Sequence, residues 1–289
     1  MDSALTTVAL PLALGIIMFG LGLSLTVDDF RRVAKAPRAV AVALGCQLVL
    51  LPLVCFGLVK VLDLDPLLAV GMMLLAASPG GTTANLFSHL FRGDVALNVS
   101  LTAVNSIIAL FTLPLITNLA IDHYGLDDEV SLPFSEVVQV FAIVLIPVAI
   151  GMFVRARSID FADRMERPVR IGSAIILAVL VLAVLIDQRS NVTDYLQDVG
   201  LATALFCAIS LVTGYYVPKL AGVREDQAVA SSMEIGVHNA TLAIYVAVEI
   251  LDSTEISVPA AVYSLVMFAF ATLWGLVLTK KLIKTPQPA

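Results

Sequence analysis

Ser231 to Glu249 reads SSMEIGVHNATLAIYVAVE, and this stretch places one carboxylate, Glu234, inside an otherwise apolar segment. An ionised side chain near the middle of a bilayer costs roughly 2.5 to 3.5 kcal/mol on insertion scales, so such a residue usually has a partner or a function. The polar residues of EIGVHN do not share one helical stripe, and the segment contains a glycine. The stretch therefore predicts two half-helices joined by an unwound section, rather than one continuous span.

The composition indicates a membrane protein that crosses the bilayer many times. Of the 289 residues, 59% are hydrophobic and 14% are charged, and the mean hydropathy is +0.97. An ordinary soluble domain has about 25% charged residues. At about 20 residues per span, the chain has room for roughly nine or ten spans and for no separate soluble domain. We therefore expect a single membrane domain over residues 1–289.

Nine apolar runs are the predicted spans, which makes the expected fold an all-α polytopic membrane protein. The runs lie at about residues 6–25, 39–59, 67–91, 95–121, 134–154, 169–186, 199–217, 228–250 and 259–279. Of the 17 basic residues, all but Lys60 and Arg189 fall in loops on one side of the membrane. Because basic loops stay in the cytoplasm during insertion, the N-terminus is predicted outside and the C-terminus inside a cell (inner) membrane.

Two of the runs are interrupted. The third contains SPGGTTAN, residues 78–85, where proline and two glycines cannot continue an ordinary helix, and the eighth contains EIGVHN. The two runs are five spans apart, so they cross the membrane in opposite directions. This pattern predicts two inverted repeats, residues 1–122 and 133–289, with the opening helix of the first repeat missing. Each repeat contributes one broken helix near the midplane, an arrangement typical of secondary transporters.

The chemistry of the two breaks predicts what binds there. A helix that restarts offers free N–H groups and a positive dipole end to an anion, and a helix that stops offers carbonyls to a cation. The residues at the restarts, predicted to bind a carboxylate or sulfonate, are Thr82, Thr83, Asn239, Ala240 and Thr241. Glu234 supplies a negative charge for a hard cation such as Na⁺, which prefers oxygen ligands. The neutral oxygens come from Gln47, Asn85, Asn98 and Thr102.

Four blocks carry a resemblance to a known family. They are LALGIIMFGLGLSL (residues 12–25), GCQLVLLP (45–52), SPGGTTANLFSHLFRGDVALNVSLTAV (78–104) and EIGVHNATLA (234–243). Over nearly its whole length the chain resembles the bile acid:sodium symporter family. The resemblance implies a core domain with two crossing broken helices, about residues 39–121 and 199–279. It also implies a smaller panel domain, about residues 6–25 and 134–186, and two sodium sites behind the crossing.

The resemblance also assigns the sodium ligands. Carried over residue by residue, the first site falls on Asn85, Asn98, Thr102 and Glu234. The second site falls on Gln47 and Glu234, the backbone around Ile235 and Val237, and the side chain at His238.

Several features depart from the family pattern. Ala84 stands where serine is common, and Asn98 replaces a serine while keeping an oxygen donor. His238 replaces a common glutamine; a neutral imidazole offers only nitrogen to a hard cation, and a protonated one repels it. Three alternatives follow for the second site: the backbone alone holds the ion, the site is weakened, or a proton takes part. Compared with ten-helix members of the family, the chain is also expected to lack the first panel helix.

These observations together predict a Na⁺-coupled symporter that imports an organic anion, bile-acid-like or a small carboxylate, by alternating access. A proton-coupled or uniporting carrier on the same fold is one alternative. An intramembrane hydrolase is another, but it needs a nucleophile with a base or two facing carboxylates, and the spans offer one deep carboxylate. We expect a monomer in the lipid bilayer, two bound Na⁺ ions and no nucleic-acid partner.

Overall fold

The computed structural model describes residues 10–126, 130, 132–187 and 192–284, and within these ranges the chain is helical and forms no β-sheet. The helices are α1 (Leu10–Ser24), α2 (Val27–Val33), α3 (Pro37–Gly45), η2 (Cys46–Leu50), α4 (Leu51–Val61), α5 (Pro66–Ala77), α6 (Thr83–Leu90), α7 (Val95–Tyr124), α8 (Phe134–Arg157), α9 (Ile159–Asp187), α10 (Val192–Leu220), α11 (Glu225–Gly236), α12 (Ala240–Tyr245), η3 (Val246–Ile250) and α13 (Thr254–Lys284). The predicted all-α class is confirmed. Residues 6–9 of the first predicted span lie outside the described ranges.

Several helices have the length and composition of membrane spans. In the described part of the chain, four segments are long and apolar enough to cross a bilayer: Pro37–Val61, Val95–Tyr124, Val199–Leu220 and Thr254–Lys280. Three shorter apolar helices are Pro11–Ser24, Pro66–Ala77 and Ala240–Ile250. The last two are half-length because each begins or ends at one of the interruptions. The chain is therefore a multi-pass membrane protein, while the count of nine spans stays a prediction.

Local sequence signals set three helix ends: the start of α5, the start of α7 and the end of α7. Asp65 precedes α5 and its side chain accepts a hydrogen bond from the Leu67 N–H at 3.0 Å. Asp94 precedes α7 and accepts from the Leu97 N–H, also at 3.0 Å. Such capping satisfies N–H groups that have no partner within the helix. Gly125 ends α7 in the left-handed conformation, φ 67°, which glycine adopts without a steric penalty.

The charged stretch at residues 155–170, between two of the predicted spans, is mostly helical. Helix α9 begins at Ile159, after an extended residue at Ser158. Asp160 lies in the first turn of α9, where a negative charge complements the helix dipole. The acidic and basic residues of this stretch therefore belong to the end of α8 and the start of α9.

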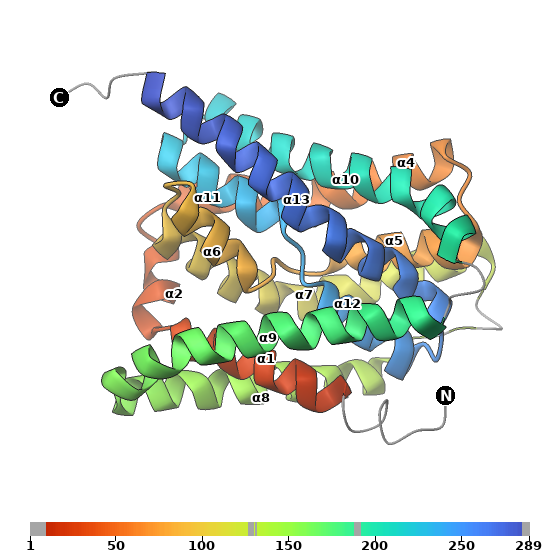
Figure 1. Cartoon of the computed structure of the whole chain (residues 1–289), viewed down its shortest axis with the longest axis horizontal. Coiled ribbons are helices and arrows are strands. Elements are labelled where there is room, and N and C mark those ends of the chain that lie inside the picture. Colours follow the sequence, from red (N-terminus) through yellow and green to blue (C-terminus); the bar gives the residue numbers. More distant parts are fainter. Residues whose placement is uncertain (1–9, 127–129, 131, 188–191, 285–289) are drawn as a thin grey trace.

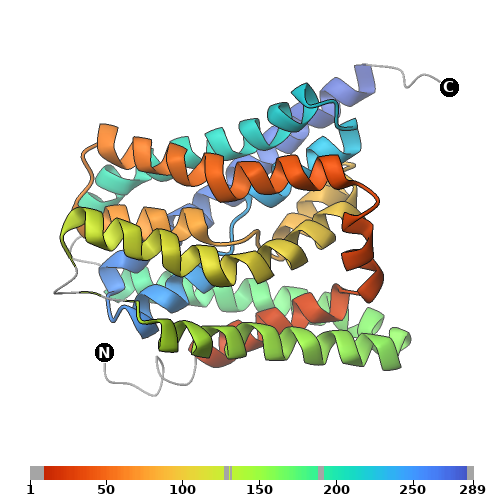
Figure 2. The same ribbon diagram turned by 180° about the vertical axis from the view of Figure 1, so that it is seen from behind.

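Helices α1, α8 and α9 pack together as one layer, which lies at the bottom of Figure 1. The closest approach is at Gly22 and Gly151, because a Cβ atom on either glycine would collide with the backbone of the other helix. Small residues allow such close packing between membrane helices. Seen from behind, α7 runs between this layer and the helix formed by α3, η2 and α4 (Figure 2).

The two interruptions meet in the middle of the molecule. The first separates α5 from α6 and the second separates α11 from α12, and Figure 1 shows the two connecting segments near the centre. The Gly81 N–H donates to the Val237 carbonyl at 2.7 Å, and the Asn239 N–H donates to the Pro79 carbonyl at 2.8 Å. These bonds form an antiparallel bridge between Gly80 and His238. Backbone groups that each break frees from its own helix are thus satisfied by the other break.

Candidate cation and anion sites

Glu234 lies in the last turn of α11 and is 2% exposed. Its Oε2 accepts a hydrogen bond from the Thr102 hydroxyl at 2.6 Å. A Cβ atom at Gly80 would collide with the Glu234 carboxylate, so only glycine fits there. No described lysine, arginine or histidine pairs with this carboxylate. Glu234 therefore contacts α7 and the first break while its charge lacks a protein counter-ion.

Four of the predicted cation ligands carry buried oxygen atoms that have no hydrogen-bond partner among the described residues. They are Gln47 Oε1, Asn85 Oδ1, Asn98 Oδ1 and Glu234 Oε1. The amide of Asn98 is fixed by its Nδ2, which donates to the Ala230 carbonyl at 2.8 Å. Leaving a buried polar atom unpaired costs about 1–3 kcal/mol. Carboxylate and amide oxygens are the ligands of hard cations, so this donor set fits Na⁺.

The predicted second site is organised around the Ser78 carbonyl. Gln47, in the π-helical segment η2, donates from Nε2 to this carbonyl at 3.1 Å, and His238 Nδ1 lies 3.2 Å from the same oxygen. A protonated Nδ1 makes the second contact a hydrogen bond and leaves Nε2 as an acceptor, and Nε2 is buried without a partner. The imidazole of His238 stacks on the Phe206 ring, with 5.5 Å between the ring centroids. It contacts the Tyr263 ring edge-on, with 5.4 Å between the centroids. His238 is thus held between the first break and two aromatic rings.

The residues predicted to bind the anion divide into two groups. Thr82 lies at the start of α6, makes no capping bond with its side chain, and lines a cavity. Asn239 instead caps α12, because its Oδ1 accepts from the Leu242 N–H at 3.1 Å. Asn239, Ala240 and Thr241 are 7%, 1% and 4% exposed and do not line this cavity. The start of α6 is therefore exposed to the cavity, whereas the start of α12 is buried and does not reach it.

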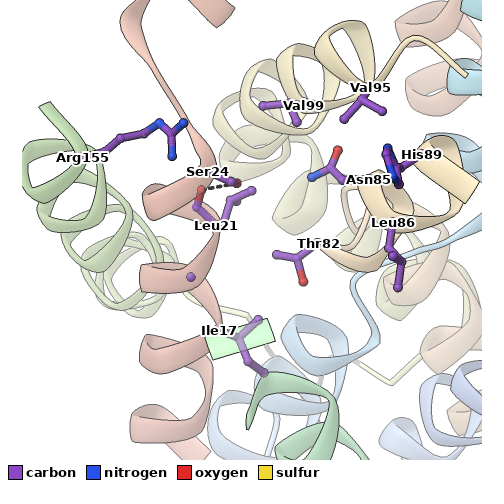
Figure 3. Close-up of a pocket in the computed structure, with 11 residues that line it drawn as sticks. Ile17, Leu21, Ser24, Thr82, Asn85, Leu86, His89, Val95, Val99 and Arg155 are labelled. Atoms are coloured by element: carbon purple, nitrogen blue, oxygen red, sulfur yellow. Dashed lines mark hydrogen bonds between the residues drawn. The ribbon is translucent and has the colours of Figure 1, made fainter. Parts of the chain in front are cut away.

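The cavity has a volume of about 480 Å³ and lies between α1, α6, the start of α7 and the end of α8 (Figure 3). Its wall consists of Ile17, Gly20, Leu21, Ser24, Thr82, Asn85, Leu86, His89, Val95, Val99 and Arg155. The volume lies within the range of about 300–1,000 Å³ that is typical of sites for small organic molecules. The wall combines six apolar residues or glycines with five polar residues. Asn85 lines this wall and is also one of the four predicted cation ligands that have an unpaired oxygen.

The sequence did not identify three polar residues of this wall. Ser24 and His89 were given no role in the sequence analysis, and Arg155 was counted only among the basic residues of the loops predicted to be cytoplasmic. The available signal for Arg155 was its place directly after the apolar part of α8, two residues before Arg157. Residues two apart do not share a helix face, so only one of the two arginines can point into the molecule.

The sequence profile of the Sodium Bile acid symporter family matches residues 11–195. The chain belongs to this family. It is 29% identical over 272 residues to YocS of Bacillus subtilis, described as an uncharacterized sodium-dependent transporter, covering 93% of this chain and 83% of that protein. It is 24% identical over 280 residues to the human ileal sodium/bile acid cotransporter, covering 94% and 79%. A probable chloroplastic sodium/metabolite cotransporter of Arabidopsis thaliana, BASS1, is 29% identical over 254 residues, covering 87% of this chain.

Membership of the sodium bile acid symporter family decides between two of the classes considered from the sequence. The relatives are named as sodium-dependent transporters rather than enzymes, which argues against the intramembrane hydrolase. The chain spans 62% of the length of the Arabidopsis relative. The names of the relatives therefore indicate the class of sodium-dependent transporters.

Proposed function

We propose that this protein is a Na⁺-coupled symporter that carries an organic anion into the cell by alternating access. The observation that carries the proposal is the set of four buried oxygens without a partner, on Gln47, Asn85, Asn98 and Glu234. Asn85 is also one of the residues that line the cavity. The charge of Glu234 has no counter-ion in the described structure, and a monovalent cation supplies one. The names of the relatives, which are sodium-dependent or sodium-coupled, support Na⁺ as that cation.

The coupling between the two cargoes follows from electrostatics. Without Na⁺, the negative charge of Glu234 raises the free energy of an organic anion in the neighbouring cavity. A bound Na⁺ neutralises that charge and is coordinated by the amide oxygen of Asn85. This coordination orders the start of α6 at the cavity wall. Binding of the anion in turn makes the binding of Na⁺ more favourable by the same free energy, because coupling between two binding sites is reciprocal.

In this proposal, the layer of α1, α8 and α9 moves relative to the remaining helices, and this movement exposes the sites. The layer takes the part of the predicted panel and the remaining helices that of the core. The proposed inverted repeats, residues 1–122 and 133–289, contribute one break each to the bridge between Gly80 and His238. The cavity lies beside Arg155 and near the turn that follows α6, in the loops predicted to be cytoplasmic. With the N-terminus outside, the cavity opens inward, in a state that releases cargo to the cytoplasm.

A proton-coupled carrier on the same fold is the second candidate. The unpartnered Nε2 of His238 supports it, because this nitrogen is buried at the predicted second cation site and can accept a proton. In the first candidate the second Na⁺ relies on Gln47 Oε1 and on backbone oxygens instead.

Uptake into proteoliposomes tests both candidates. Radiolabelled taurocholate and a panel of small carboxylates are offered under an inward Na⁺ gradient, an inward proton gradient, or neither. The Na⁺-coupled symporter requires the Na⁺ gradient, and Glu234→Ala abolishes uptake. Uptake driven by a pH jump in the absence of Na⁺ identifies the proton-coupled carrier, and uptake that needs neither gradient rejects both. Binding of ²²Na⁺ to the purified protein provides a readout that does not depend on knowing the anion.

A further inference from the structure

We propose that the free edge of the Arg155 guanidinium, formed by its Nε–H and Nη2–H groups, is an anion-binding subsite on the α1 and α8 side of the cavity. The subsite takes a carboxylate or sulfonate group of the transported molecule. It deepens the proposed function, since it assumes that the cavity holds the organic anion. It is separate from the helix restart at Thr82, which lies on the α6 side (Figure 3).

The hydrogen bonds of Arg155 leave this edge available. Nη1 donates to the Leu23 carbonyl at 2.8 Å and to Asp163 Oδ1 at 3.3 Å. Arginine has five N–H donors, and these two contacts account for both N–H groups on Nη1. Among the described residues, no partner is found for Nε or Nη2. These two nitrogens present parallel N–H groups whose spacing matches the two oxygens of a carboxylate or sulfonate.

The two contacts of Nη1 also hold the guanidinium in place. Leu23 lies in the last turn of α1, where carbonyl groups have no partner in the helix and attract a cation. Asp163 comes from α9, so all three helices of one layer position the Arg155 side chain. A residue that only capped α1 would need no access to the cavity, whereas Arg155 lines the wall and its side chain is 23% exposed.

The other groups on the wall do not duplicate this role. Among the residues that line the cavity, Arg155 is the one with a permanent charge. The hydroxyl of Ser24 beside it already donates to the Leu21 carbonyl at 2.7 Å, so it cannot donate to an anion at the same time. Thr82 and Asn85 face the cavity from α6, on the opposite side from Arg155 (Figure 3).

This arrangement defines the class of molecule that fits the cavity best. Its acidic group lies against Arg155, and a hydroxyl, amide or second acidic group lies toward Thr82 and Asn85. Such a molecule contacts both the α1, α8 and α9 layer and the helices that carry the breaks. Its binding therefore depends on how the two parts are placed relative to each other.

The charge selectivity of a cysteine placed in the cavity tests the subsite without a known substrate. Ser24→Cys puts a thiol next to Arg155, and the three native cysteines, Cys46, Cys55 and Cys207, are buried. The thiol is modified in parallel by an anionic methanethiosulfonate carrying a sulfonate and by a cationic one carrying a trimethylammonium group. The measured quantity is the ratio of the two modification rates, with the parent protein as the control for the native thiols.

Arg155→Gln is expected to lower the ratio of anionic to cationic modification by roughly fivefold, because removing a nearby unit charge changes each rate by roughly twofold to threefold, in opposite directions. Arg155→Lys restores most of the ratio. Arg157→Gln is the matched control, since the Arg157 guanidinium lies 5.1 Å from the Phe153 ring centroid and does not line the cavity. An unchanged ratio in Arg155→Gln, or an equal fall in Arg157→Gln, overturns the proposal.

A second variant keeps the test decisive if Arg155→Gln does not fold. Asp163→Asn removes a negative charge beside the guanidinium at a residue whose side chain is 56% exposed, so the fold tolerates it. The ratio is then expected to rise by about twofold to threefold, and a ratio that stays the same or falls contradicts the subsite. Neither result depends on Na⁺ or on transport. A positive result combined with Na⁺-independent uptake would reject the proposed coupling and leave the subsite standing.

Discussion

Replacing Glu234 by glutamine removes the negative charge of the proposed cation site while keeping the size of the side chain. The carboxylate is 2% exposed, Thr102 engages Oε2, and Oε1 has no partner. Removing one member of a buried charge pair costs about 3–5 kcal/mol, which is roughly a 150- to 5,000-fold loss of affinity. One amide oxygen remains in Glu234→Gln, so we expect the lower part of this range, a loss of at least about 100-fold in Na⁺ affinity.

Binding of ²²Na⁺ to the purified protein measures this loss directly, and thermal unfolding of the same samples shows whether the variant is folded. Glu249→Gln is the matched control, because Glu249 lies in η3 and is only partly buried. Its Na⁺ affinity should stay within about twofold of the parent protein. A Glu234→Gln protein that is folded and binds Na⁺ within threefold of the parent would refute the assignment of this carboxylate as the cation ligand.

Three further predictions follow from individual contacts. Gly80→Ala places a methyl group against the Glu234 carboxylate and should weaken ²²Na⁺ binding by at least about tenfold, whereas Gly45→Ala, whose Cβ meets nothing within 4 Å, should leave it unchanged. His238→Gln restores an amide oxygen at the second site, so uptake should keep or strengthen its Na⁺ dependence, and a pure loss of transport would contradict this interpretation. Asp94→Ala removes the cap of α7 and should lower the free energy of unfolding by about 1 kcal/mol in denaturant titrations; an unchanged value would show that the cap is not formed.

The candidate cation ligands could be selected from the sequence because polar side chains are unusual in apolar spans. A carboxylate at Glu234 and amides at Gln47 and Asn98 are costly in apolar spans, so their presence alone marked them. The structure brings the Thr102 hydroxyl to 2.6 Å from Glu234 Oε2, and both residues belong to the predicted first sodium site. That these residues bind Na⁺ stays a prediction, which the variants above test.

The cavity was less predictable because it is assembled from surfaces far apart in the chain. Its wall joins α1, α6 and the end of α8, and no local pattern shows which side of a helix end faces the others. Arg155 and Arg157 are the same residue type at the same end of α8, and they differ in which side of the helix their side chains leave from. The predicted anion residues at α12 were equally plausible by sequence, but Asn239 caps its own helix and Thr241 is buried away from the cavity.

The sequence by itself determined that the chain is an α-helical membrane protein with two interrupted spans. Those properties depend on local free energies: the transfer of apolar runs into lipid, and the inability of Pro79 and the adjoining glycines to continue a helix. Only the tertiary structure decided that the interruptions pair through Gly81 and Asn239, and which buried oxygens remain without a partner. Hydrogen-bond satisfaction in lipid depends on groups roughly 160 residues apart meeting within 3 Å, and local composition does not encode that distance.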